Sequence, residues 1–99
     1  MTIKQLLEQL NIPFAYGFFK QPVNPPYIVY LGNGQETFGG DNTWYHTENK
    51  YQLEYYFAYK NELNENLIEQ TLLSNGFNYT KSEDVYIESE GLFVIYYTI

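Results

Sequence analysis

The clearest pattern in the chain is an alternation of apolar and polar residues over Tyr51–Lys60. Every second position is apolar or aromatic: Tyr51, Leu53, Tyr55, Phe57 and Tyr59. This two-residue period is that of a strand with one buried face. The positions between them are polar apart from Tyr56 and Ala58. We therefore expect a central strand of an antiparallel sheet, with helices packed on its apolar face.

Two segments have the spacing of amphipathic helices. The first, Ile3–Leu10, follows a capping box formed by Thr2 and Gln5. The second, Glu62–Ser74, is capped by Asn61 and ends before Asn75-Gly76. Its expected buried stripe consists of Leu63, Leu67, Ile68, Leu72 and Leu73.

The remaining apolar segments predict further strands between turn signals. They are Phe14–Phe19, Tyr27–Leu31, Trp44–Glu48, Phe77–Lys81, Val85–Glu88 and Leu92–Thr98, the last expected to be buried on both faces. Gly32–Gly34 is typical of a turn and Gln35–Asn42 of a loop, and Glu48–Lys50 predicts a hairpin connection. We expect a single α+β domain over residues 1–99, with a mostly antiparallel sheet of about five or six strands and both helices on one face.

Aromatic residues are too numerous for a core of this size. The 99 residues include 12 Tyr, 7 Phe and one Trp. Tyrosine combines an apolar ring with a polar tip and is enriched at interfaces. We expect a subunit or partner interface that includes Tyr27, Tyr30, Phe38, Trp44, Tyr45 and Tyr56.

The charge balance limits the classes of partner. The chain has 5 Lys, no Arg and 12 acidic residues, a net charge of −7. Binding to a nucleic-acid backbone depends on Lys and Arg, so this composition argues against it, and it also disfavours anionic membranes. The N-terminal residues lack the apolar stretch of a signal peptide, and no apolar run is long enough to span a bilayer. We expect a soluble, cytosolic protein.

Candidate chemistry is sparse. His46 is the only histidine, and no motif places a nucleophile or an orienting carboxylate with it. Asp41 follows Gly39-Gly40 but lacks the spacing of a calcium-binding loop, and no cysteine is present to bind a metal. We expect no enzymatic activity, no catalytic residue, no metal site and no cofactor.

Three stretches carry a resemblance to a known group of proteins. They are Pro25–Tyr30, the sequence Gly40-Asp41-Asn42, and Tyr51–Tyr56. With these, most of the chain resembles the tail-terminator (tail-completion, head–tail joining) proteins of siphophages and prophages of Gram-positive bacteria. The resemblance implies a structural protein of the virion, assembled in the host cytoplasm. It would form a ring, usually of six subunits, that caps the tail tube and contacts the tail-tube and head-connector proteins.

The same resemblance implies a channel through which DNA passes without being bound. Acidic residues would line it, and the candidates are Glu36, Asp41, Glu83, Asp84, Glu88 and Glu90. The segment Gln35–Thr43 is a candidate for an arm that becomes ordered on assembly. Two alternatives stay open: a head-completion adaptor or stopper of the phage neck, and an acidic inhibitor that mimics DNA and binds a host enzyme.

Overall fold

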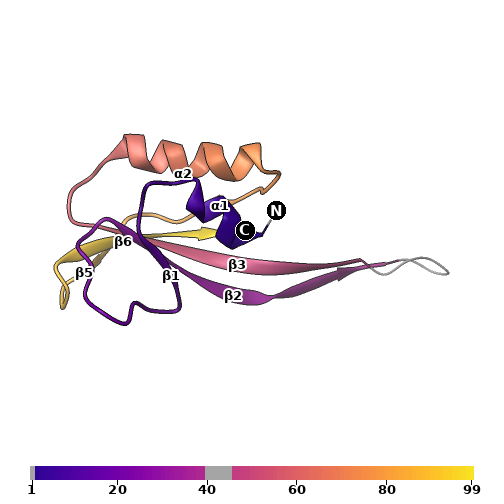
Figure 1. The fold of residues 1–99 in the computed structure, drawn as a ribbon, viewed down its shortest axis with the longest axis horizontal. Coiled ribbons are helices and arrows are strands. Elements are labelled where there is room, and N and C mark those ends of the chain that lie inside the picture. The colour runs from indigo at the N-terminus through magenta and orange to yellow at the C-terminus, as the bar shows by residue number, and fades with distance from the viewer. Residues whose placement is uncertain (1, 40–45) are drawn as a thin grey trace.

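The computed structural model describes residues 2–39 and 46–99, without the side chains of residues 38 and 46 (Figure 1). The described elements are α1 (Ile3–Glu8), β1 (Phe14–Tyr16), β2 (Tyr27–Phe38), β3 (His46–Phe57), α2 (Glu62–Ser74), β4 (Thr80–Lys81), β5 (Val85–Ile87) and β6 (Leu92–Thr98). The sheet has the order β1-β2-β3-β6-β4, and β5 also pairs with β6. Only β1 and β2 are parallel among these pairs. Both helices lie on one side of the sheet, so the predicted α+β architecture is confirmed (Figure 1).

Strand β3 lies at the centre of the sheet, as its alternating pattern predicted. Leu53, Tyr55 and Phe57 are buried on the face that the helices cover. The pattern does not extend to Tyr59, which is 87% exposed. Strand β3 ends at Phe57, and the chain then bends towards the cap of α2, so Tyr59 no longer follows the sheet.

The helix caps form as predicted. Thr2 and Gln5 make the reciprocal hydrogen bonds of a capping box at the start of α1. The Asn61 side chain accepts hydrogen bonds from two backbone N–H groups in the first turn of α2. These bonds satisfy donors that a helix start otherwise leaves without partners.

The buried face of α2 differs from the predicted stripe. Ile68 and Leu72 are buried, but Leu63 is 79% exposed and Leu67 46% exposed. Glu65 occupies the buried face in their place. Two lysines pair with this carboxylate: Lys60, just before the cap of α2, and Lys81 on β4. Leu73, the fifth residue of the predicted stripe, is also exposed.

The predicted turn at Gly32–Gly34 is wrong, because β2 continues through it. Gly32 is the register partner of Tyr51, and Gln35 is the partner of Asn49. Three steps along β2 therefore match two along β3, which is a β-bulge. Gly34 has φ of +79°, in the left-handed region that favours glycine. A bulge and a turn both use such a residue, so the sequence signal was the same.

The predicted hairpin at Glu48–Lys50 is also wrong. Strand β3 runs without interruption from His46 to Phe57, and its N-terminal part pairs with β2, with Phe38 opposite His46. Residues 35–38 of the predicted loop are thus part of β2. The residues here are polar because both faces of this two-stranded ribbon contact solvent, and not because the chain turns.

The smaller strands follow the prediction with shorter bounds. β1 ends at Tyr16, before Gly17, and β4 contains only two residues. β6 has the predicted bounds, and its adjacent residues Val94 and Ile95 are both fully buried. Because adjacent strand residues point to opposite faces, β6 is buried on both sides, as expected.

Candidate functional site

The first candidate is a two-stranded arm that extends from the sheet. We define the arm as residues 32–38 of β2 and residues 46–50 of β3 (Figure 1). β1 pairs with β2 only as far as Tyr30, and β6 reaches β3 only as far as Gln52. Backbone hydrogen bonds between Tyr51 and Ile99 close the body of the sheet. Beyond this point, neither outer edge of the arm has a strand partner among the described residues.

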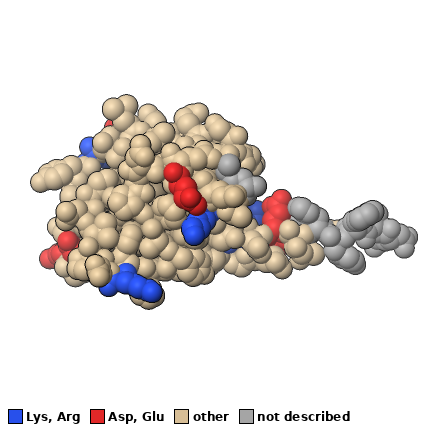
Figure 2. All heavy atoms as spheres, viewed as in Figure 1, with Lys and Arg blue, Asp and Glu red and all other residues tan. Residues whose placement is uncertain are grey.

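The two sides of the arm differ in chemistry. On one side, Lys50 Nζ lies 3.6 Å from Glu36 Oε2 and 3.3 Å from Glu48 Oε2. On the other side, Gln35 Nε2 donates a hydrogen bond of 2.9 Å to Asn49 Oδ1. Figure 2 shows acidic and basic side chains together where the arm leaves the body. The arm thus has one charged side and one neutral side, and no apolar core of its own among the described side chains.

The second candidate is a pocket on the face of the sheet opposite the helices, which we call the open face. The segment joining β1 to β2 passes over this face (Figure 1). A cavity of about 620 Å³ lies between this segment and the strands. Its lining consists of Gly17, Phe18, Phe19, Lys20, Gln21, Pro22, Val23, Tyr27, Val29, Glu54, Tyr56, Glu90 and Leu92.

Aromatic rings form one wall of this pocket. Tyr27 and Tyr56 are register partners on β2 and β3, and their rings stack with centroids 5.1 Å apart. Phe19 packs edge-on against Tyr27 at 5.3 Å. Such ring pairs contribute stabilising free energy in addition to that from the burial of their apolar area. The two tyrosine rings are held on a strand pair inside the sheet, whereas Phe19 comes from the segment that joins β1 to β2.

Glu54 places a carboxylate beside these rings. Its Oε1 accepts a hydrogen bond of 2.8 Å from the Tyr56 hydroxyl, and its Oε2 accepts one of 3.3 Å from Gln52 Nε2. Burial raises the pKa of Tyr56, and the hydrogen bond to Glu54 raises it further, so this hydroxyl remains a donor. Burial, followed by the charge of Glu90, raises the pKa of Tyr27. Within the described chain, neither carboxylate in the pocket has a lysine within ion-pairing distance.

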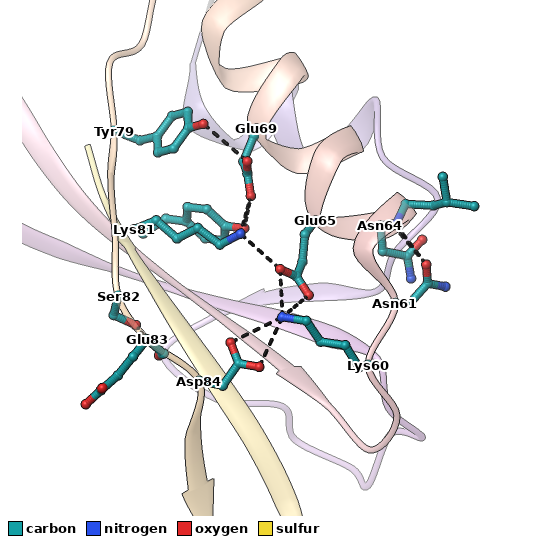
Figure 3. A network of polar contacts seen from close by, with 12 residues as sticks. Lys60, Asn61, Asn64, Glu65, Glu69, Tyr79, Lys81, Ser82, Glu83 and Asp84 are labelled. Atoms are coloured by element: carbon teal, nitrogen blue, oxygen red, sulfur yellow. Dashed lines mark hydrogen bonds and ion pairs between the residues drawn. The ribbon is translucent and has the colours of Figure 1, made fainter.

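The third candidate is a polar cluster between α2 and the strands (Figure 3). Glu65 is only 2% exposed. Lys60 Nζ lies 2.8 Å from Glu65 Oε2 and donates a hydrogen bond of 3.1 Å to Glu65 Oε1. Glu65 Oε2 itself accepts no hydrogen bond from the described residues. Lys81 Nζ lies 2.9 Å from Glu65 and 2.8 Å from Glu69. Lys60 also pairs with Asp84 at 3.0 Å.

Every charge in this cluster has a partner, which indicates a structural role. Tyr79 and Tyr97 donate hydrogen bonds of 3.2 and 2.8 Å to Glu69. Burial opposes the charge of Glu69, but hydrogen bonds from Lys81 and the two tyrosines lower its pKa overall. Burial likewise opposes the charge of Lys81, and its carboxylate partners raise its pKa overall. The cluster attaches α2 to the edge of the sheet and presents no free group to a substrate.

The aromatic residues predicted for an interface separate into three groups. Tyr27 and Tyr56 meet in the pocket on the open face. Tyr30 lies on the other face, where it packs against the core and the rings of Phe14 and Tyr16. The other three are not placed: the Phe38 side chain, Trp44 and Tyr45 lie outside the described residues.

The acidic residues predicted to line a channel do not lie together in the described structure. Glu36 is on the arm, Asp84 is paired in the polar cluster, and Glu90 lines the pocket. Glu83 and Glu88 are exposed. Asp41 lies outside the described residues. Whether any of them faces a channel stays a prediction.

Sequence reasoning did not identify the segment that closes the pocket. Phe18 and Phe19 were assigned to a strand, and Glu54 was assigned to a solvated strand face. One signal was present: the large ring of Tyr56 lies beside Glu54 on a face that is polar except for Tyr56 and Ala58. A large aromatic ring on a strand face that is otherwise expected to contact solvent indicates that another segment of the chain covers part of that face.

Comparisons of the sequence with known protein families and with curated proteins find no match. Neither described helix is long and apolar enough to cross a membrane. No group of three or more potential metal ligands is present in residues 2–39 and 46–99.

Proposed function

We propose that this protein is a structural component of phage assembly that works by pairing its arm with neighbouring proteins, and that it is the tail terminator of a long-tailed phage. The observation that carries the proposal is the arm, whose two outer edges lack strand partners among the described residues. A protein of this kind needs no catalytic group or cofactor.

The arm has the properties of a strand-addition site. An isolated two-stranded ribbon is only marginally stable in water, and the open edges expose backbone donors and acceptors. An extended segment of another protein satisfies these groups by adding a strand. The polar side chains of the arm, with Lys50 among them, disfavour indiscriminate edge pairing. The arm is therefore suited to specific pairing with a complementary strand of a neighbouring protein.

Apolar surface outside the arm supports burial by other subunits. Leu63 and Leu67 are exposed one turn apart on α2, and Tyr59 and Tyr86 are also exposed. In a closed ring, each subunit uses two different patches for its two neighbours. The arm and the outer face of α2 are two such patches on one chain.

The assignment to the phage tail depends on the resemblance of the sequence to tail terminators. In that role a ring of copies, with six subunits expected, would cap the tail tube and meet the head connector in the virion. An adaptor or stopper of the neck would use the same physical contacts with different partners. Loss of the protein distinguishes these roles: particles without a terminator have overlong tubes, whereas particles without an adaptor or stopper have normal tails that do not join heads.

A shortened arm tests the structural part of the proposal. We would replace residues 36–48 with Asn-Gly, a two-residue hairpin turn that joins the register partners Gln35 and Asn49. The control is the pair Thr37→Ser and Thr47→Ser, which changes side chains but keeps the arm backbone. Native mass spectrometry should show rings for the control and for the unaltered chain, and monomers for the shortened chain. Rings of unchanged size and tails of normal length with the shortened arm would refute the proposal.

A further inference from the structure

The pocket on the open face combines three features of a cation-binding site. Its wall contains the stacked rings of Tyr27 and Tyr56 and the edge-packed ring of Phe19. Its lining includes the carboxylates of Glu54 and Glu90, and only one lysine, Lys20. Its volume of about 620 Å³ is within the range of pockets that hold small ligands or single side chains.

We propose that this pocket binds an arginine side chain from a basic segment of a partner protein. The guanidinium group would lie against the tyrosine rings and pair with Glu54, while Glu90 would contribute charge at the pocket edge.

The electrostatics of the pocket favour a cation over a neutral or anionic group. Glu54 is half-buried, and both of its oxygens accept hydrogen bonds from neutral donors, Tyr56 and Gln52. These bonds fix the carboxylate in place but leave its charge without a counter-ion in the described chain. A partly desolvated carboxylate beside aromatic rings attracts a cation in two ways: through the opposite charge of the carboxylate and through cation–π contact with the ring faces.

The shape of the wall favours arginine over lysine. A guanidinium group is planar, stacks on tyrosine rings and bonds a carboxylate through two parallel N–H groups. Tyr27 and Tyr56 stack on one another with 24° between their ring planes, so each ring covers one face of the other, and a planar guanidinium would stack on an outer face of the pair. An ammonium group is a compact, strongly hydrated charge and gains less from such a surface.

The charge of the chain indicates that the arginine comes from a different protein. The sequence contains no arginine, and a second copy would bring another net charge of −7. Among the residues that line the pocket, Lys20 on the covering segment is the one lysine. Lys20 has no ion pair among the described residues, so no ion pair has to break if Lys20 moves when the partner's arginine binds.

The test is a titration of the isotope-labelled chain, followed by nuclear magnetic resonance, with the end-blocked peptide Gly-Gly-Arg-Gly-Gly. We expect saturable shifts of the backbone signals of Phe19, Tyr27 and Tyr56. A peptide with citrulline in place of arginine has the same shape without the charge and should not bind. Glu54→Gln keeps a hydrogen-bond acceptor for Tyr56 but removes the charge, and should weaken binding by about tenfold.

The controls distinguish specific binding in the pocket from nonspecific electrostatic attraction to an acidic protein. Glu83→Gln removes an exposed acidic charge outside the pocket and should leave the affinity unchanged. Glu90→Gln, on the exposed pocket edge, should weaken binding by about threefold and provides a second test if Glu54→Gln does not fold. Equal weakening by the changes at Glu83 and Glu54, binding of the citrulline peptide, or equal affinity for a lysine peptide would overturn the proposal.

Discussion

Glu65 shows how a single residue determines the placement of a helix. Its carboxylate is almost completely buried, and burial of a charge is costly unless partners compensate for it. Lys60 and Lys81 approach it from the two sides, at 2.8 and 2.9 Å. The long lysine side chains remain partly exposed, so their charges keep much of their hydration. This arrangement makes a buried glutamate compatible with a core-facing position on α2.

Removal of this carboxylate should destabilise the fold. We expect Glu65→Ala to lower the free energy of unfolding by about 2 kcal/mol, because two lysines lose their shared partner next to the core. Urea denaturation measures this loss. Gln70→Ala, at an exposed position of the same helix, is the matched control and should change stability by less than about 0.5 kcal/mol. Similar losses for both variants would contradict a special role for Glu65.

Glu69 makes the stability depend on pH in the acidic range. Its pKa is lower in the folded chain than the ordinary value of 4.5 because of Lys81 and the two tyrosines. A carboxyl group with a depressed folded pKa stabilises the fold above its unfolded pKa, and this contribution disappears as the pH falls through the folded pKa. We therefore expect the free energy of unfolding to decrease below pH 4.5. Glu69→Gln should flatten this decrease, whereas the same change at the exposed Glu83 should not.

The elements of the fold differ in how well the sequence predicts them. Local signals identified α2 and both helix caps, since capping depends on residues within one turn. The buried face of α2 was predicted only in part, because the pairing of Glu65 with Lys81 joins residues far apart in the chain. The pocket could not be predicted, since it forms where the segment after β1 crosses the open face of β2 and β3. Its two tyrosines were identified only as interface candidates.

Strand periodicity fails at one point for a definite reason. Counting alternate residues from Ile28 along β2 places Glu36 on the helix side of the sheet. The bulge inserts one residue, and Glu36 instead lies on the side of Lys50. A pattern with one extra residue cannot be distinguished from a strand end without the partner strand. The turn itself was predicted from the residues Gly32–Gly34, which suit a bulge as well as a turn.

Two leucines of α2 test the corrected face directly. Leu63→Ala and Leu72→Ala remove the same atoms from positions that the sequence pattern treats as equivalent. Leu72 is fully buried, so its truncation should cost about 3 kcal/mol of unfolding free energy. Leu63 is exposed in the isolated chain, so its truncation should cost less than about 0.5 kcal/mol. Thermal or urea unfolding of the two variants checks this difference, and equal losses would contradict the observed buried face of α2.

Gly34 tests the bulge as an element. Alanine at this position meets no atom within 4 Å, so its only cost is the backbone φ of +79°. We expect Gly34→Ala to destabilise the arm by about 1 kcal/mol and to accelerate hydrogen exchange of arm amides by several-fold, without changing the body. Gly32→Ala is the control, because that residue does not have the left-handed φ and its added carbon would make only an ordinary contact with Tyr16. Identical exchange in the two variants would contradict the role of Gly34.

The molecule as a whole is extended and acidic. Its radius of gyration is 15.1 Å, compared with about 13 Å for a compact domain of about 100 residues. The principal extents of 52 × 25 × 25 Å reflect the arm that leaves the body (Figure 1). An extended shape gives a small chain more surface for neighbours, while a net charge of −7 makes identical copies repel one another at low salt and opposes their association.

Salt should therefore affect two associations in opposite directions. Added sodium chloride screens the repulsion between copies and should favour ring formation through backbone pairing and apolar contacts. The same salt should weaken arginine binding in the pocket, because that contact depends on opposite charges. Light scattering and the peptide titration measure the two effects. Dissociation of rings by moderate salt would show that ion pairs, and not strand pairing, hold the copies together.

The position of the bulge relative to the end of β6 determines how the arm can move. The pair Gly32–Tyr51 is the last one supported by the body, and Asn33 and Gly34 follow immediately without ladder partners on β3. Bending at these two residues breaks no ladder contact on either side of them. If the ribbon bends there, the buried rows of β3 and β6 stay unchanged. In the assembly that we propose, a single body conformation would then suit neighbours that approach from unequal directions.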